Sequence, residues 1–80
     1  MPVSVERLVQ ELEKLKAEMD AGNLKTSEYD QRLARVVREL RDQGLDADRA
    51  RINDVLSDAL KRGVITPAVK NHIEKRLGLS

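Results

Sequence analysis

The chain contains no cysteine, no phenylalanine and no tryptophan, and its single tyrosine is Tyr29. Without cysteine it has no disulfide, no thiolate nucleophile and no zinc–thiolate site. With one aromatic side chain it lacks the stacking platforms by which proteins hold single-stranded nucleic acids and RNA loops. The one histidine, His72, cannot form a metal cluster alone. We therefore expect neither a metal site nor any other cofactor.

Long apolar runs are also missing. No stretch approaches the ~20 consecutive apolar residues that a membrane-spanning helix needs. Residues 1–6 lack the basic and apolar regions of a signal peptide. The sequence therefore predicts a cytoplasmic protein that does not bind a membrane.

A strong charge of one sign is absent as well. The 15 lysines and arginines nearly balance the 14 aspartates and glutamates, which leaves a net charge of +1. Residues 1–21 are slightly acidic and residues 45–80 slightly basic. This asymmetry is too small to name a partner, and it falls short of the strongly basic footprint of nucleic-acid-binding domains.

Four glycines and two prolines divide the 80 residues. Each glycine follows an amphipathic segment, where the left-handed residue that ends a helix is typically found. The clearest boundary lies within residues 60–67, because Gly63 can end one helix, Thr66 can cap the next and Pro67 suits its first position. Val64 and Ile65 are apolar within this boundary, which indicates a turn anchored to the core.

These signals predict an all-α fold of four helices, at about residues 4–21, 27–43, 46–62 and 67–77. Because the connections are short, consecutive helices should be antiparallel neighbours. We expect a hairpin at about residues 4–43 and a second at about 46–78, packed as a small bundle in a single domain, 1–80. The caps that we expect for the first three helices are Ser4, then Thr26 or Ser27, and Asp46.

The apolar residues of the first helix follow the a/d spacing of a coiled-coil seam. This seam consists of Val5, Leu8, Leu12, Leu15 and Met19. Facing it in the second helix we expect Tyr29, Leu33, Val36 and Leu40, with Val37 at the edge. The predicted inward residues of the second hairpin are Ile52, Val55, Leu56, Ala59, Leu60, Val69, Ile73 and Leu77.

The two hairpins share a pattern that an internal repeat would explain. Aligning Thr26 with Thr66 places Leu33 on Ile73 and leaves one residue fewer in the second turn. Any two capped amphipathic helices share this spacing, so duplication and chance remain alternatives.

Part of the first hairpin, residues 12–40, resembles the SHOCT family of short helical hairpins. The resemblance is carried by Gly22, Leu24, Thr26 and the pair Glu28-Tyr29, which follow an amphipathic helix. An extra residue, Lys25, separates the aliphatic residue from Thr26. The resemblance implies a helical hairpin that oligomerises or associates with other proteins and has no catalytic residues.

Catalytic chemistry finds little support in the sequence. Ser57 and His72 are the closest to a nucleophile and base, but no orienting carboxylate or oxyanion site accompanies them. We therefore predict that the protein is not an enzyme and has no small-molecule substrate.

The sequence favours a non-enzymatic protein–protein interaction or oligomerisation module. A seam as long as that of the first helix outruns the fourth helix and leaves apolar surface for a partner. The partner is expected to be a second copy, with a dimer favoured, or another protein. The predicted partner-binding residues are Leu8, Leu12, Leu15, Met19 and Tyr29.

Two alternatives remain open at this stage. In the first, a small DNA-binding regulator of phage or plasmid type uses residues 67–77 as a recognition helix. Its contact residues would be Lys70, Asn71, His72, Lys75 and Arg76. In the second, an adaptor or inhibitor uses the acidic first helix, with Glu11 and Glu18, to bind a basic protein surface.

Overall fold

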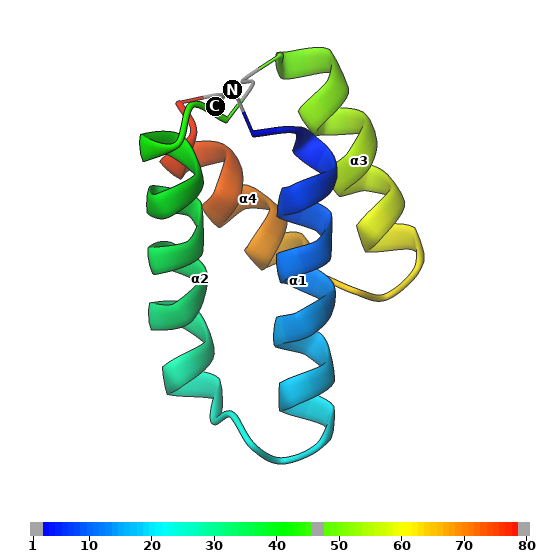
Figure 1. The fold of residues 1–80 in the computed structure, drawn as a ribbon. Coiled ribbons are helices and arrows are strands. Elements are labelled where there is room, and N and C mark those ends of the chain that lie inside the picture. Colours follow the sequence, from blue (N-terminus) through cyan, green and yellow to red (C-terminus); the bar gives the residue numbers. More distant parts are fainter. Residues whose placement is uncertain (1–2, 46–47, 79–80) are drawn as a thin grey trace.

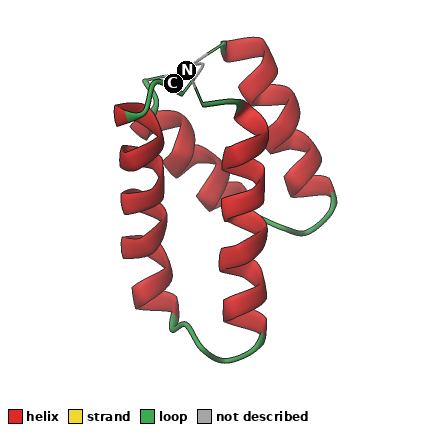
Figure 2. Ribbon diagram, in the orientation of Figure 1, coloured by secondary structure: helices red, strands yellow, loops and turns green. Residues whose placement is uncertain are grey.

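The computed structural model of the protein describes residues 3–45 and 48–78. Within this part of the chain there are four helices and no strand, which confirms the predicted all-α fold (Figures 1 and 2). The helices are α1 (Val5–Asp20), α2 (Thr26–Asp42), α3 (Arg49–Lys61) and α4 (Pro67–Arg76). None of the described helices is both long and apolar enough to cross a membrane.

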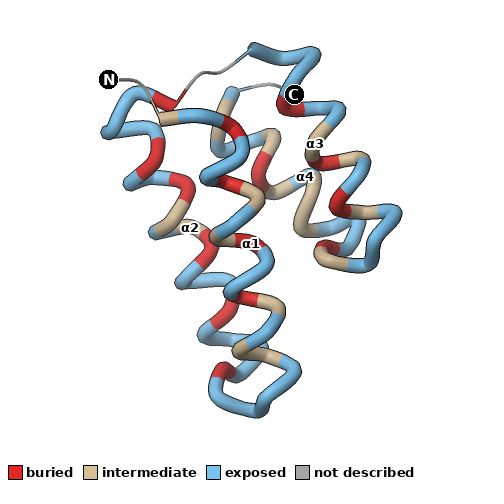
Figure 3. The backbone as a smooth tube through the Cα atoms, turned by 45° about the vertical axis from the view of Figure 1, so that its right-hand side comes forward, coloured by how far each residue is buried: buried red, intermediate tan, exposed pale blue. Residues whose placement is uncertain are grey.

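The second hairpin packs against one side of the first. Helix α1 contacts both α2 and α3, and α4 contacts both α2 and α3. The first hairpin is the longer one, and the turn between α1 and α2 extends beyond the corner between α3 and α4 (Figures 1 and 3). The tip of the first hairpin therefore overhangs the second.

One hydrophobic cluster draws on all four helices and on three connecting residues. Its buried residues, red along the backbone in Figure 3, lie along the helices between exposed ones. The largest of the fully buried side chains are Leu8, Leu12, Leu33, Ile52, Leu56 and Ile73. Among the described residues, no polar or charged residue is buried with them. The core is therefore purely apolar, and its cohesion comes from the removal of apolar surface from water.

The corner between α3 and α4 has the geometry that residues 60–67 predict. Gly63 has a φ of +77°, and its N–H donates to the carbonyl of Leu60 over 3.1 Å. The N–H of Val64 donates to the carbonyl of Ala59 over 2.9 Å, which completes a Schellman motif. Ile65 is 4% exposed, so the corner is anchored to the core as expected.

The start of α4 is also as predicted. The side-chain oxygen of Thr66 accepts a hydrogen bond from the N–H of Val69 over 3.2 Å. Pro67 is the first helical residue, where its missing N–H leaves no hydrogen bond unmade.

The predicted start of α2 is wrong by one or two residues. Thr26 is the first helical residue rather than the cap, and the cap position belongs to Lys25. A lysine side chain has no hydrogen-bond acceptor. Instead, the Glu28 carboxylate accepts a hydrogen bond from the Lys25 backbone N–H over 3.1 Å. Looking in the sequence for a polar residue at the cap position does not reveal this contact.

The position of Lys25 also corrects the proposed alignment of the hairpins. Lys25 and Thr66 are equivalent caps, and each follows its turn glycine by three residues. The two turns therefore have equal length, and the second is not one residue shorter. With the caps aligned, Leu33 falls on Glu74 instead of Ile73. Caps and core positions thus give different registers, which weakens the case for a repeat.

Two further details differ from expectation. The cap of α3 is Asp48, whose side chain accepts a hydrogen bond from the N–H of Arg51 over 3.2 Å. The expected cap, Asp46, lies outside the described residues. In α2, Val37 is buried and Val36 only partly so, the reverse of the prediction. The reason is that α2 packs against both α1 and α4, whereas the prediction considered α1 alone.

Candidate functional site

Four of the five predicted partner-binding residues belong to the buried core, and the three leucines among them lie deepest in it. Leu8 and Leu12 are 0% exposed, and Leu15 is 3% exposed. The chain's own helices α2 and α3 cover the α1 seam. In this conformation, therefore, these three leucines are not accessible to another molecule.

The other two predicted residues, Met19 and Tyr29, line a groove at the end of the seam. We call it the corner groove, because the corner between α3 and α4 forms one of its walls. The groove encloses about 370 Å³. Its lining residues are Lys16, Met19, Asp20, Thr26, Tyr29, Asp30, Gly63, Val64, Ile65, Thr66, Ala68 and Val69.

The overhang of the first hairpin creates this groove. The last turns of α1 and the first turn of α2 form one wall, and the corner with the first turn of α4 forms the other. Met19, Val64 and Val69 are partly exposed apolar residues that pack against the edge of the core. Ala68 is exposed at the second helical position of α4. The result is an apolar concavity that the chain does not fill by itself.

The polar groups at the groove are unevenly neutralised. The ammonium of Lys16 lies 2.6 Å from the carboxylate of Asp20. Asp30 is exposed, and none of the described residues forms an ion pair with it. Burial raises the pKa of the Tyr29 hydroxyl above its ordinary value of 10.0, and the negative charge of Asp30 raises it further. The net charge at the groove is therefore one unpaired carboxylate beside an apolar surface.

Sequence reasoning found Met19 and Tyr29 but did not assign Val64, Ala68 or Val69 to a binding surface. The signal that it did register was the apolar character of the corner. How far the first hairpin extends past that corner depends on the packing of the two hairpins. A helical wheel contains no information about that packing.

The predicted nucleic-acid-binding residues of α4 do not form a uniform basic surface. Lys70 lies 2.6 Å from Glu74, and both side chains are 20% exposed. His72 is partly buried, and its Nε2 atom is buried without a hydrogen-bond partner. The other three, Asn71, Lys75 and Arg76, are exposed. The charge of Lys70 is thus neutralised and His72 is partly buried. The exposed groups that remain are two cations, Lys75 and Arg76, and one amide, Asn71.

Acidic residues of α1 pair with basic residues of the same chain. Glu6 pairs with Arg51 of α3, and Glu13 lies 3.3 Å from Arg62 at the end of α3. The pKa of Glu6 is lowered, first by a hydrogen bond from its own backbone N–H and further by the charge of Arg51. Glu11 and Glu18, the two residues expected to meet a basic partner, lie 3.4 Å from Arg7 and 3.8 Å from Arg32. The acidic surface of α1 is therefore partly neutralised within the molecule.

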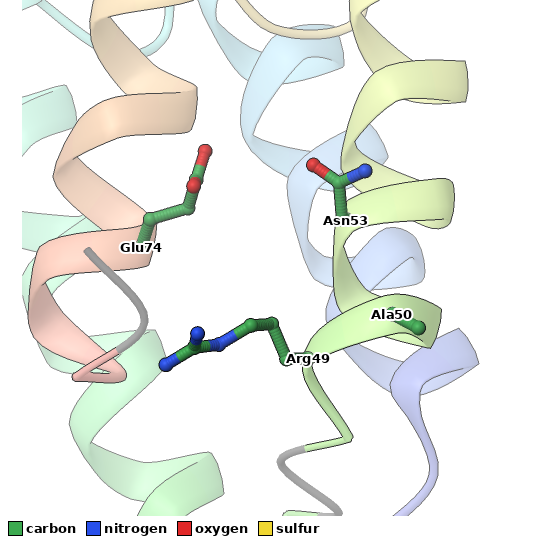
Figure 4. Close-up of a pocket in the computed structure, with 4 residues that line it drawn as sticks. All are labelled: Arg49, Ala50, Asn53 and Glu74. Carbon is green, nitrogen blue, oxygen red and sulfur yellow. The ribbon is translucent and has the colours of Figure 1, made fainter.

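A second hollow, of about 440 Å³, lies between the beginning of α3 and α4 (Figure 4). Arg49, Ala50, Asn53 and Glu74 line it, with the side chains of Arg49 and Glu74 extending toward the space between the helices. Arg49 and Glu74 give this hollow charges of both signs, and Ala50 is the one apolar residue among the four that line it. Within residues 3–45 and 48–78, no group of three or more histidine or acidic side chains is placed to hold a metal.

No family model, curated protein or solved structure matches the chain. The SHOCT resemblance of residues 12–40 therefore stays a prediction, and the assignment of function depends on the corner groove itself.

Proposed function

We propose that the protein is a non-enzymatic protein–protein interaction module that docks through the corner groove. The observation that carries this proposal is the gathering of Met19, Val64 and Val69, all partly exposed, around the largely buried ring of Tyr29. Concave apolar surfaces with an aromatic residue are typical sites at which proteins bind one another. Interaction energy usually concentrates at such a cluster.

The proposed interface, at the corner groove, differs from the α1 seam that the sequence predicts. Association through the α1 seam would require the hairpins to separate, because Leu8 and Leu12 are fully buried. Docking at the corner groove leaves the core intact. Any partner, whether a second copy or another protein, is proposed to bind there.

The proposal can be tested with a matched pair of variants. Ala68→Gln places a longer uncharged side chain in the groove at the second position of α4. Ser27→Gln places the same glutamine side chain at the second position of α2, on an exposed site that does not line the groove. Because both variants change equivalent helix positions, their effects on stability should be similar.

The measurement combines sedimentation of the pure protein with affinity capture from an extract of the source organism. We expect the wild type either to self-associate or to capture another protein. Ser27→Gln should keep this interaction, and Ala68→Gln should lose it. If sedimentation reveals a monomer and every captured protein is also retained by Ala68→Gln, the proposal is wrong.

A further inference from the structure

We infer that the occupant of the corner groove is a basic amphipathic helix of another protein, which inserts a few aliphatic side chains and places a lysine or arginine beside Asp30. This inference rests on the proposed function and specifies the chemistry of the partner. Three properties of the groove carry it: the backbone of its walls, its size and its charge.

The backbone of the groove walls favours a helix over an extended peptide. The described part of the chain has no strand, so it offers no sheet edge with which an extended peptide could pair. The N–H groups of Gly63, Val64 and Val69 are already donated to groups of the chain. An extended peptide would therefore find few backbone partners in the groove, whereas a helix satisfies its own backbone groups internally.

The size of the groove favours a few anchoring side chains over a broad interface. A standard stable interface buries about 800 Å² and involves roughly 20–30 residues on each side. The corner groove has 12 lining residues, on a molecule with 5293 Å² of accessible surface. Its volume of about 370 Å³ lies near the lower end of binding pockets, which span roughly 300–1,000 Å³. One helix face with apolar residues at i, i+3 or i+4, and i+7 fits this space better than a second copy does.

The charge at the groove favours a basic partner. The Asp20 carboxylate neutralises Lys16 at 2.6 Å, so Asp30 carries the unpaired charge. A lysine or arginine on the incoming helix gains an attractive contact there, and an acidic residue is repelled. Because Asp30 is exposed, this contact should contribute more to partner choice than to affinity.

The test is a selection from displayed helical peptides. The library contains peptides of about 15 residues, near the length at which an isolated helix becomes marginal. Its members vary on one helical face of an alanine-rich scaffold and are selected on the wild-type protein. We expect enriched peptides with apolar residues at helical spacing and with lysine or arginine beside them.

Three variants identify the site and the charge preference. Ala68→Gln should weaken binding of the selected peptides by about tenfold or more, equivalent to about 1.4 kcal/mol. Ser27→Gln should leave binding unchanged. Asp30→Lys should reverse the preference, so that selection on this variant enriches acidic peptides.

Several results would overturn the inference. The enriched peptides could be acidic or extended and bind Ala68→Gln more weakly than the wild type. This result would contradict the basic helix but leave the proposed docking function intact. A wild-type dimer that Ala68→Gln dissociates identifies the occupant as a second copy. The absence of enriched peptides, or equal binding by Ala68→Gln, contradicts the basic helix at this groove. The capture and sedimentation measurements then decide the proposed function separately.

Discussion

A single residue, Leu12, can show whether the α1 seam is part of the core or an interface with another molecule. It is 0% exposed in the middle of the α1 seam, and a coiled-coil pattern alone does not indicate whether such a leucine packs within its own chain. We expect Leu12→Ala to lower the free energy of unfolding by about 2–5 kcal/mol, because the lost methyl groups leave a cavity. Urea denaturation measures this change, and Lys14→Ala on the exposed face is the control. An altered oligomeric state with unchanged stability would identify Leu12 as an interface residue instead.

Tyr29 allows the groove to be observed by titration. Because burial and Asp30 raise its pKa above 10.0, folding favours the neutral phenol. This contribution to stability is complete below pH 10 and is lost as the pH rises through the folded-state pKa. The protein has no other tyrosine and no tryptophan, so tyrosinate absorbance follows this group alone. We expect the titration midpoint of Tyr29 to be higher in the folded protein than in urea. In folded Asp30→Asn, the midpoint should be lower than in the folded wild type but still above that in urea. Equal midpoints in the folded and unfolded protein would contradict the burial of this ring.

At the scale of the helices, two caps of similar appearance should differ in their contribution. The Thr66 side chain accepts a hydrogen bond from Val69, whereas Ser4 precedes α1 without a side-chain cap bond. Thr66→Ala should therefore lower the free energy of unfolding by about 1 kcal/mol. Ser4→Ala should have a much smaller effect, so each variant is the control for the other. Thermal unfolding of both variants checks the prediction, and equal losses would contradict it.

The same comparison explains which helix boundaries the sequence reveals. Gly63, Thr66 and Pro67 act through local backbone chemistry, so the end of α3 and the start of α4 could be predicted from residue type. The start of α2 could not, because it depends on a contact from Glu28 to the backbone of Lys25. The buried stripe of α2 was displaced from Val36 to Val37 by its second neighbour, α4. Local signals therefore predict where helices end, and tertiary contacts decide which faces are buried.

The candidate site was predictable to the extent that its residues lie at the end of a periodic pattern. Met19 and Tyr29 occupy the last seam position of α1 and the first of α2, so sequence alone suggests that both are important. The groove also needs Val64, Ala68 and Val69, which belong to another hairpin. Their contribution follows from the overhang of one hairpin past the other, a property of the assembled fold.

A single copy of the chain is compact, and its stability comes from its core rather than from its surface charges. The radius of gyration is 11.8 Å, close to the value of about 11.6 Å expected for a compact chain of this length. Among the described residues, the ion pairs that link α1 to α2 or to α3 and its C-cap are Glu6–Arg51, Glu13–Arg62 and Glu18–Arg32, and their side chains are about half exposed. Each contributes little and is weakened by salt. The stability of a single copy thus depends on the shared apolar core.

A shared core predicts that neither hairpin folds alone. Helix α1 packs against α3, and α2 packs against α4, so separating residues 1–44 from residues 45–80 exposes the core side of each hairpin. Helices α3 and α4 have 13 and 10 residues, at or below the roughly 12–15 residues at which isolated helices are marginal. We expect both separate peptides to have low helicity by circular dichroism, with the full chain at equal concentration as the control. A monomeric, fully helical first hairpin would contradict the predicted single domain, because it would mean that the seam of α1 needs no partner beyond α2.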